Sequence, residues 1–160
     1  MYRTLNAALF LLVSIFAGIC HGDPKIPDGW KASDYLGRNC DDVASALGYV
    51  SLSGFVPEEF TVGNATFRVE ASSRTICWVR EDLGGWKTIE QVGDQIAKRT
   101  GKLPPPPLLV NTGVHATWHL PGMVVQAEGK DPAQVGSGIH RSTTYKSVTF
   151  VHRPKMPPRL

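Results

Sequence analysis

Cysteine is scarce in this sequence of 160 residues, with only three, at positions 20, 40 and 77. The sequence has no cysteine pair at zinc-ligand spacing and no H-E-x-x-H helix. It also has no G-x-S-x-G motif and no phosphate-binding glycine loop. These absences leave no motif-defined hydrolase, nucleotide-binding or zinc site. We therefore predict no catalytic residue, no metal ligand and no cofactor from motifs.

An excess of one charge is also lacking, because 17 Lys and Arg stand against 14 Asp and Glu. That balance is too even to indicate a nucleic acid or an anionic membrane as partner. The partner that we expect is a protein. Nothing in the sequence indicates an oligomer, and we expect a monomer.

Only one long apolar run is present, from Ala7 to Ala17. Arg3 precedes it and small residues follow, which is the layout of a secretory signal peptide over residues 1–22. We place cleavage after Gly22, with cleavage after Cys20 as the alternative. The run is short for a membrane span, and a membrane anchor is the less favoured interpretation. We expect a secreted, extracellular protein with no membrane span in the mature chain.

Two cysteines then remain, Cys40 and Cys77. In an exported chain they predict one disulfide, and closing such a loop contributes roughly 4 kcal/mol in the chain-entropy estimate. A pair of free buried thiols is the alternative. Asn64-Ala65-Thr66 is a sequon that predicts glycosylation of Asn64 if the source is eukaryotic.

Two helices are predicted. The first begins at Cys40 after Asn39, a good N-cap, and ends at Gly48. The second runs over residues 88–99, opens with a T-x-x-Q capping box at Thr88 and stops at Gly101. On the second helix Ile96 falls on the inner stripe, while residues 94, 95, 98 and 99 are expected to face water.

Strand patterns fill most of the remaining chain. Alternation over residues 60–69 with a phase slip at Gly63, and β-formers over 76–80, predict a hairpin. The pattern over residues 114–127 predicts a second hairpin, and that over 147–152 predicts a further strand. The run Pro104–Pro107 is interpreted as a stiff connector or, less favoured, as a ligand for an aromatic groove on a partner. The N-terminal arm spans 23–37, the single domain 38–152 and a basic proline-rich tail 153–160. We expect an α+β fold, with two helices packed on one face of a four- or five-stranded, mainly antiparallel sheet. The open sheet face is where we expect a partner, with Trp118 as its aromatic unless that side chain is core.

Histidines raise two possibilities. His115 and His119 are four apart on a strand, a span of roughly 13 Å, so they cannot share one zinc ion. A secreted ribonuclease needs two proton-exchanging groups and an arginine for the phosphate. Those residue types occur in the C-terminal half, as His119, Glu128, His140, Arg141, His152 and Arg153.

Three segments carry a resemblance: Cys40-Asp41-Asp42-Val43-Ala44, Arg74-Thr75-Ile76-Cys77 and residues 88–96, T-I-E-Q-V-G-D-Q-I. Their order resembles small secreted fungal effectors of the killer-toxin-like and necrosis-inducing-factor type. In those proteins a cysteine usually follows the second helix, where this chain has Thr100-Gly101-Lys102. The resemblance implies a secreted effector or toxin-like protein that binds a host or competitor protein and promotes virulence, with possible later entry into a host cell. The alternative is the ribonuclease-like enzyme.

Overall fold

The computed structural model describes residues 23–51, 54–110, 114–130 and 143–153. The predicted signal peptide and nearly all of the predicted tail lie outside these residues. In chain order the elements are η1 (Ala32–Asp34), α2 (Cys40–Ala46), β1 (Glu59–Val62), β2 (Ala65–Glu70), β3 (Thr75–Lys87), α3 (Ile89–Thr100), β4 (Leu108–Val110), β5 (His115–Leu120), β6 (Met123–Lys130) and β7 (Thr144–His152).

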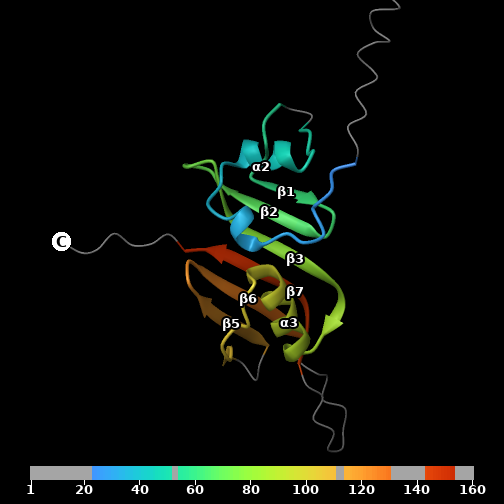
Figure 1. The fold of residues 1–160 in the computed structure, drawn as a ribbon, viewed down its shortest axis with the longest axis vertical. Coiled ribbons are helices and arrows are strands. Elements are labelled where there is room, and N and C mark those ends of the chain that lie inside the picture. Colours follow the sequence, from blue (N-terminus) through green and yellow to red (C-terminus); the bar gives the residue numbers. More distant parts are fainter. Residues whose placement is uncertain (1–22, 52–53, 111–113, 131–142, 154–160) are drawn as a thin grey trace, which may run out of the picture.

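The strands form one antiparallel sheet of seven, in the order β1-β2-β3-β7-β6-β5-β4 (Figure 1). The expected four or five strands were therefore wrong. The runs on either side of the turn at Gly63 are two separate strands. The short strand β4, which follows the four prolines, was not predicted.

The central strand β3 is longer than its sequence pattern suggested. It pairs with β2 on one side and with β7 on the other, and it continues through Gly84 and Gly85. These glycines have φ values of 68° and 152°, which suit residues without a Cβ. The register with β7 shifts between Asp82 and Lys87, so the glycines bend the strand and lead it into α3.

Both predicted helices are present with the predicted caps. The side chain of Asn39 accepts hydrogen bonds from the amides of Asp41 (2.8 Å) and Asp42 (3.3 Å) at the start of α2. At the start of α3 Thr88 and Gln91 form the capping box, and Gly101 ends the helix at a φ of 76°. These local interactions satisfy backbone groups that a helix end leaves unpaired.

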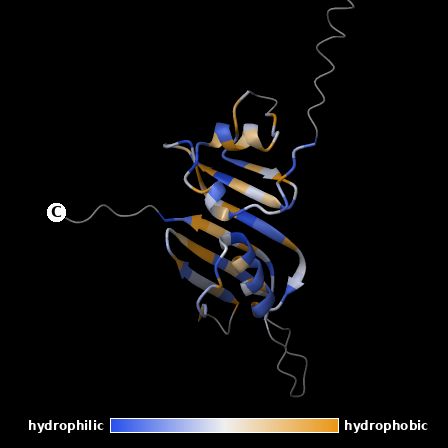
Figure 2. Ribbon diagram, viewed as in Figure 1, coloured by the Kyte–Doolittle hydropathy of each residue, from blue (hydrophilic) through white to orange (hydrophobic). Residues whose placement is uncertain are grey.

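One face of the sheet carries the core. Trp30 from the N-terminal arm packs edge-on against Phe150 of β7, and Tyr35 packs edge-on against Phe67 of β2. Val92 and Ile96 of α3 are fully buried in the same core cluster. Figure 2 shows the matching apolar segments along the central strands β6 and β7. Both helices and the N-terminal arm lie on this face of the sheet, and no described helix lies on the other face.

The predicted disulfide is absent, because Cys40 and Cys77 are both free. Arg68 pairs with Trp78 and Val69 with Ile76, so Cys77 is the extra residue of a β-bulge. Ile76 and Val79 face the core, while the thiol of Cys77 donates to the carbonyl of Arg68 at 3.4 Å. Cys40 is buried in the core. The bulge therefore turns the side chain of Cys77 away from Cys40, the disulfide partner that strand alternation predicted.

Candidate functional site

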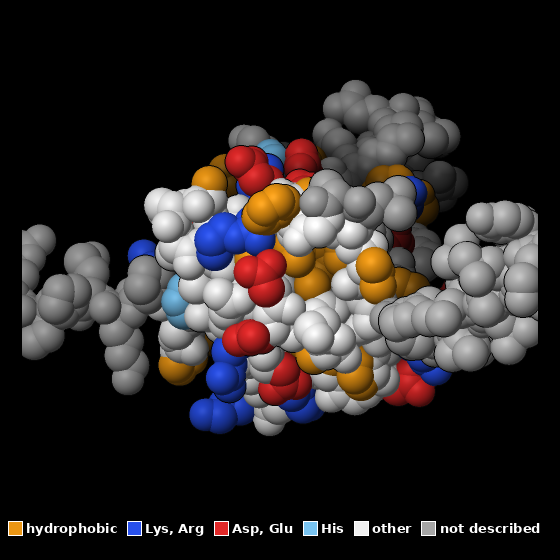
Figure 3. All heavy atoms as spheres, turned by 90° about the horizontal axis from the view of Figure 1, so that it is seen from above, with side chains coloured by type: hydrophobic (Ala, Val, Ile, Leu, Met, Phe, Trp, Pro, Cys, Tyr) orange, Lys and Arg blue, Asp and Glu red, His pale blue; other side chains and the backbone are white. Residues whose placement is uncertain are grey.

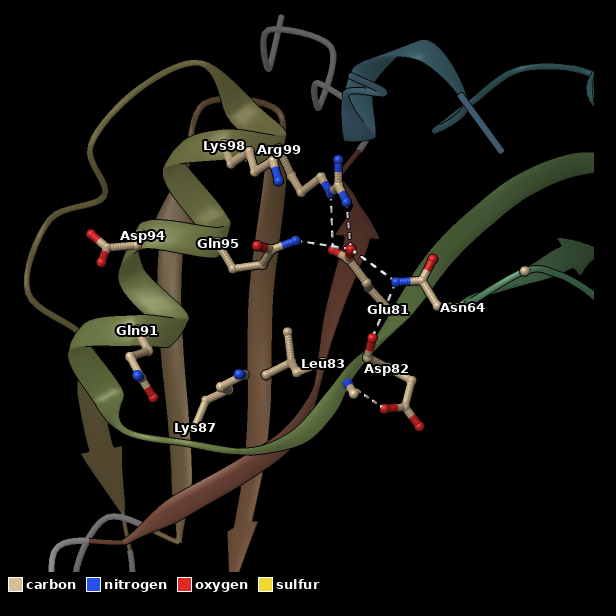
Figure 4. Close-up of a pocket in the computed structure, with 12 residues that line it drawn as sticks. Asn64, Glu81, Asp82, Leu83, Lys87, Gln91, Asp94, Gln95, Lys98 and Arg99 are labelled. Carbon is tan, nitrogen blue, oxygen red and sulfur yellow. Dashed lines mark hydrogen bonds and ion pairs between the residues drawn. The ribbon is translucent and has the colours of Figure 1, made fainter. Parts of the chain in front are cut away.

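A polar groove of about 750 Å³ lies between the β1–β2 turn, the bent part of β3 and helix α3 (Figure 4). The turn contributes Asn64, and β3 contributes Glu81 and Asp82. Helix α3 contributes Gln95 and Arg99 from successive turns. Most of the side chains that line the groove are polar or charged.

A buried ion pair forms the floor of this groove. Glu81 is 1% exposed and Arg99 is 6% exposed. Arg99 donates through Nη2 to Oε1 of Glu81 at 2.6 Å and through Nε to Oε2 at 3.0 Å. Oε1 of Glu81 also accepts from Gln95 at 2.8 Å and from Asn64 at 3.3 Å. The arginine was expected to face water, and this prediction was wrong.

Arg99 also holds the N-terminal arm. Its Nη1 donates to the carbonyls of Asp28 (3.3 Å) and Trp30 (3.4 Å), and its guanidinium lies 4.3 Å from the centroid of a Trp30 ring. Every charged group of the pair thus has protein partners. A satisfied buried pair of this kind joins arm, helix and sheet, and it offers no free charge for chemistry.

The amide of Asn64 belongs to the same network. Its Nδ2 donates to Glu81 and, at 3.2 Å, to the carbonyl of Asp82. Asn64 is exposed in the β1–β2 turn, so the predicted glycosylation site is accessible. A glycan on this nitrogen would replace one of its two hydrogens and leave a single donor for the two bonds.

The opposite face of the sheet is the second candidate. The register of the strands determines which side chains lie on this face, and we call it the open face. One row crosses every strand and consists of Thr61, Thr66, Arg80, Thr149, Gln126, Thr117 and Leu108. Hydroxyl and amide groups dominate this row. No helix of the described chain lies over it.

Arg80 and Trp78 form the centre of the open face. The Arg80 guanidinium lies 5.4 Å from the Trp78 ring centroid, and its Nη2 is 3.9 Å from a carboxylate oxygen of Glu59. Arg80 lines two shallow hollows, of about 240 and 260 Å³. No motif in the sequence singles out Arg80, although its alternation with buried Val79 and Glu81 places it on this face.

The structure separates the two histidines expected to exchange protons. His119 lies on the open face, opposite Val124 of β6. His152 lies on the other face, where its ring packs beside Gly37. Two groups on opposite faces of one sheet cannot act on one substrate bond. His140 and Arg141 lie outside the described residues, and Arg153 is exposed just after β7.

Trp118 was expected on the open face unless its side chain was core, and the second alternative holds. It is 2% exposed and belongs to the core cluster. Strand β5 alternates as predicted, and Trp118 shares the covered face with Ala116. Trp78, next to the bulge at Cys77, takes that position on the open face.

In the described part of the chain, no group of three or more His, Cys, Asp or Glu residues could hold a metal ion. No helix within the same residues is long and apolar enough to cross a membrane. The face seen from above α2 shows acidic and basic side chains interspersed (Figure 3). Neither acidic nor basic side chains dominate that face.

Comparison with known proteins adds no relative. No family model, no curated protein and no solved structure matches this chain.

Proposed function

We propose that this chain is a secreted effector or toxin-like protein that binds a host or competitor protein through the open face of its sheet. The observation that carries the proposal is the pairing of Trp78 with Arg80 at the centre of that face. Tryptophan and arginine are the residues most enriched at energetic hot spots of protein interfaces.

The surroundings of this pair support the same function. The carboxylate of Glu59 lies 3.9 Å from Arg80 and 3.7 Å from Arg68, so the three charged side chains form a cluster beside Trp78. Arginine is among the residues enriched at protein interfaces. Threonine and glutamine side chains around the pair supply hydrogen-bonding groups of the kind found at interface rims.

The test compares two variants made in parallel. Trp78→Ala/Arg80→Ala removes the centre of the open face, while Lys98→Ala removes an exposed side chain of α3 on the covered side. Each protein is immobilised and exposed to host extract, after a melting curve has shown that it is folded. We expect wild type and Lys98→Ala to retain the same partner and the double variant to lose it. Retention of that partner by the double variant would refute the proposed surface.

A second candidate, the secreted ribonuclease, is favoured by one observation. His115 and Glu128 stand directly opposite each other on the open face. Glu128 was among the residues that the sequence analysis named, and His115 takes the place of the expected histidines.

A further inference from the structure

His115 and Glu128 occupy facing positions on the antiparallel strands β5 and β6. The amide of Gly129 donates to the carbonyl of Val114 at 2.6 Å, which makes residues 114 and 129 a hydrogen-bonded pair. Hydrogen-bonded and non-hydrogen-bonded pairs alternate along such a ladder. His115 and Glu128 are therefore a non-hydrogen-bonded pair, the kind whose side chains lie closest, with Cβ atoms about 4.5–5.5 Å apart.

Both side chains are exposed and line the hollow of about 240 Å³ on the open face. The rest of its lining consists of hydroxyl and amide side chains, Arg80 and two alanines. No ion pair joins the imidazole of His115 to the carboxylate of Glu128 in the described structure. Their polar atoms therefore remain available to a third molecule placed between them.

The neighbouring strand limits what this pair can do. Ser147 of β7 follows Glu128 in the same row, so the order across the strands is His115, Glu128, Ser147. The serine lies two strand spacings from the histidine, roughly 9.6 Å, and the imidazole cannot take its proton directly. A substrate that carries its own nucleophile needs no activated serine in this hollow.

We propose that His115 and Glu128 form an acid–base pair that cleaves single-stranded RNA. The ribose 2′-hydroxyl is the internal nucleophile. Glu128 accepts its proton as O2′ bonds to the adjacent phosphorus. The P–O5′ bond then breaks, and protonated His115 donates its proton to the leaving O5′. The products are a 2′,3′-cyclic phosphate and a free 5′-hydroxyl, so atoms and charge balance without a metal or a further reactant.

Arg80 supplies the positive charge that the reaction needs. Charge builds up on the non-bridging phosphate oxygens in the transition state, and a guanidinium binds such oxygens in bidentate fashion. Arg80 lines the same hollow from β3, one row along and two strands across from Glu128. Its guanidinium packs over Trp78 beside Glu59, so it has to turn from Trp78 toward the pair to bind the phosphate. This activity does not rest on the partner-binding function, which uses Trp78 and Arg80 but needs neither His115 nor Glu128.

The test uses a fluorescent single-stranded RNA oligonucleotide and its all-deoxy counterpart. Wild type, His115→Ala, Glu128→Gln and the double variant are purified in parallel, so that any contaminating nuclease is common to all. The matched control is His119→Ala, which removes a histidine from the same strand and the same face. Melting curves establish that each protein is folded.

We expect wild type and His119→Ala to cleave the RNA to a cyclic phosphate, and to leave the DNA intact. Because a general acid or base contributes typically 10²–10⁴-fold, each single variant at the pair should be slower by about that factor. The proposal is overturned if wild type is no faster than the double variant, if DNA is cut as well as RNA, or if His119→Ala loses as much activity as His115→Ala. A protein that binds its partner but shows no such cleavage would refute this inference alone.

Discussion

Breaking the buried pair of Glu81 and Arg99 is the sharpest test of how the fold is held together. In Arg99→Met, Glu81 loses two of its four hydrogen bonds and keeps those from Asn64 and Gln95. The carboxylate stays 1% exposed, so water cannot replace the lost partner without opening the structure. Breaking a buried pair on one side costs about 3–5 kcal/mol, a large part of a typical domain's 5–15 kcal/mol.

Additional losses come from the N-terminal arm. Arg99→Met also removes the donors to the carbonyls of Asp28 and Trp30 and the contact with the Trp30 ring. We therefore expect the destabilisation to lie at the upper end of that range. Glu81→Met leaves a buried guanidinium and should cost a similar amount. The double variant Glu81→Met/Arg99→Met buries no charge and should be more stable than either single variant, because a methionine pair fills the space without desolvating ions.

Urea unfolding of wild type, both single variants and the double variant gives a double-mutant cycle. Lys98→Met is the control, since this exposed neighbour on α3 should cost less than about 0.5 kcal/mol. The reasoning is refuted if the two single losses simply add in the double variant, or if either single variant stays within about 1 kcal/mol of wild type. Either result would mean that water reaches the pair.

Two further predictions concern the core and the thiols. Ile96 is fully buried, so Ile96→Asp places an unpaired carboxylate in the core and should abolish the cooperative melting transition. Lys98→Asp, on the exposed side of α3, should cost less than about 1 kcal/mol. Equal melting curves for the two variants would mean that the buried face of the helix is assigned wrongly. Desolvation by burial raises the pKa of both the Cys40 and the Cys77 thiol, so both stay protonated at neutral pH and should react slowly with iodoacetamide in the folded protein. After denaturation without reductant both should be fully alkylated in a peptide map, and a peptide pair joined through Cys40 and Cys77 would contradict the register at the bulge.

Local signals in the sequence determined the helices and most of the strand positions. Asn39, Thr88 with Gln91, and Gly101 act on backbone groups within a few residues of themselves, and all of them cap the helices as predicted. Alternation likewise predicted β5 and β6 with the turn between them, because the two-residue period of a strand is visible in the residues of each strand separately. The burial of Ile96 follows from the same kind of periodicity.

Tertiary structure alone decided which strands meet and which face each side chain joins. One extra residue in β3 reverses the direction of Cys77, and no signal in the chain marks that bulge. Arg99 lies three residues after Ile96 and seven after Val92, on the inner stripe of its helix, and its charge is accommodated there because Glu81, 18 residues earlier, carries the opposite charge on the facing strand. His115 faces Glu128 because the two-residue turn at Pro121 and Gly122 sets the register of the β5–β6 hairpin. The pairing of β7, which carries His152, with β6 depends on contacts between distant segments that the periodicity of each strand does not encode.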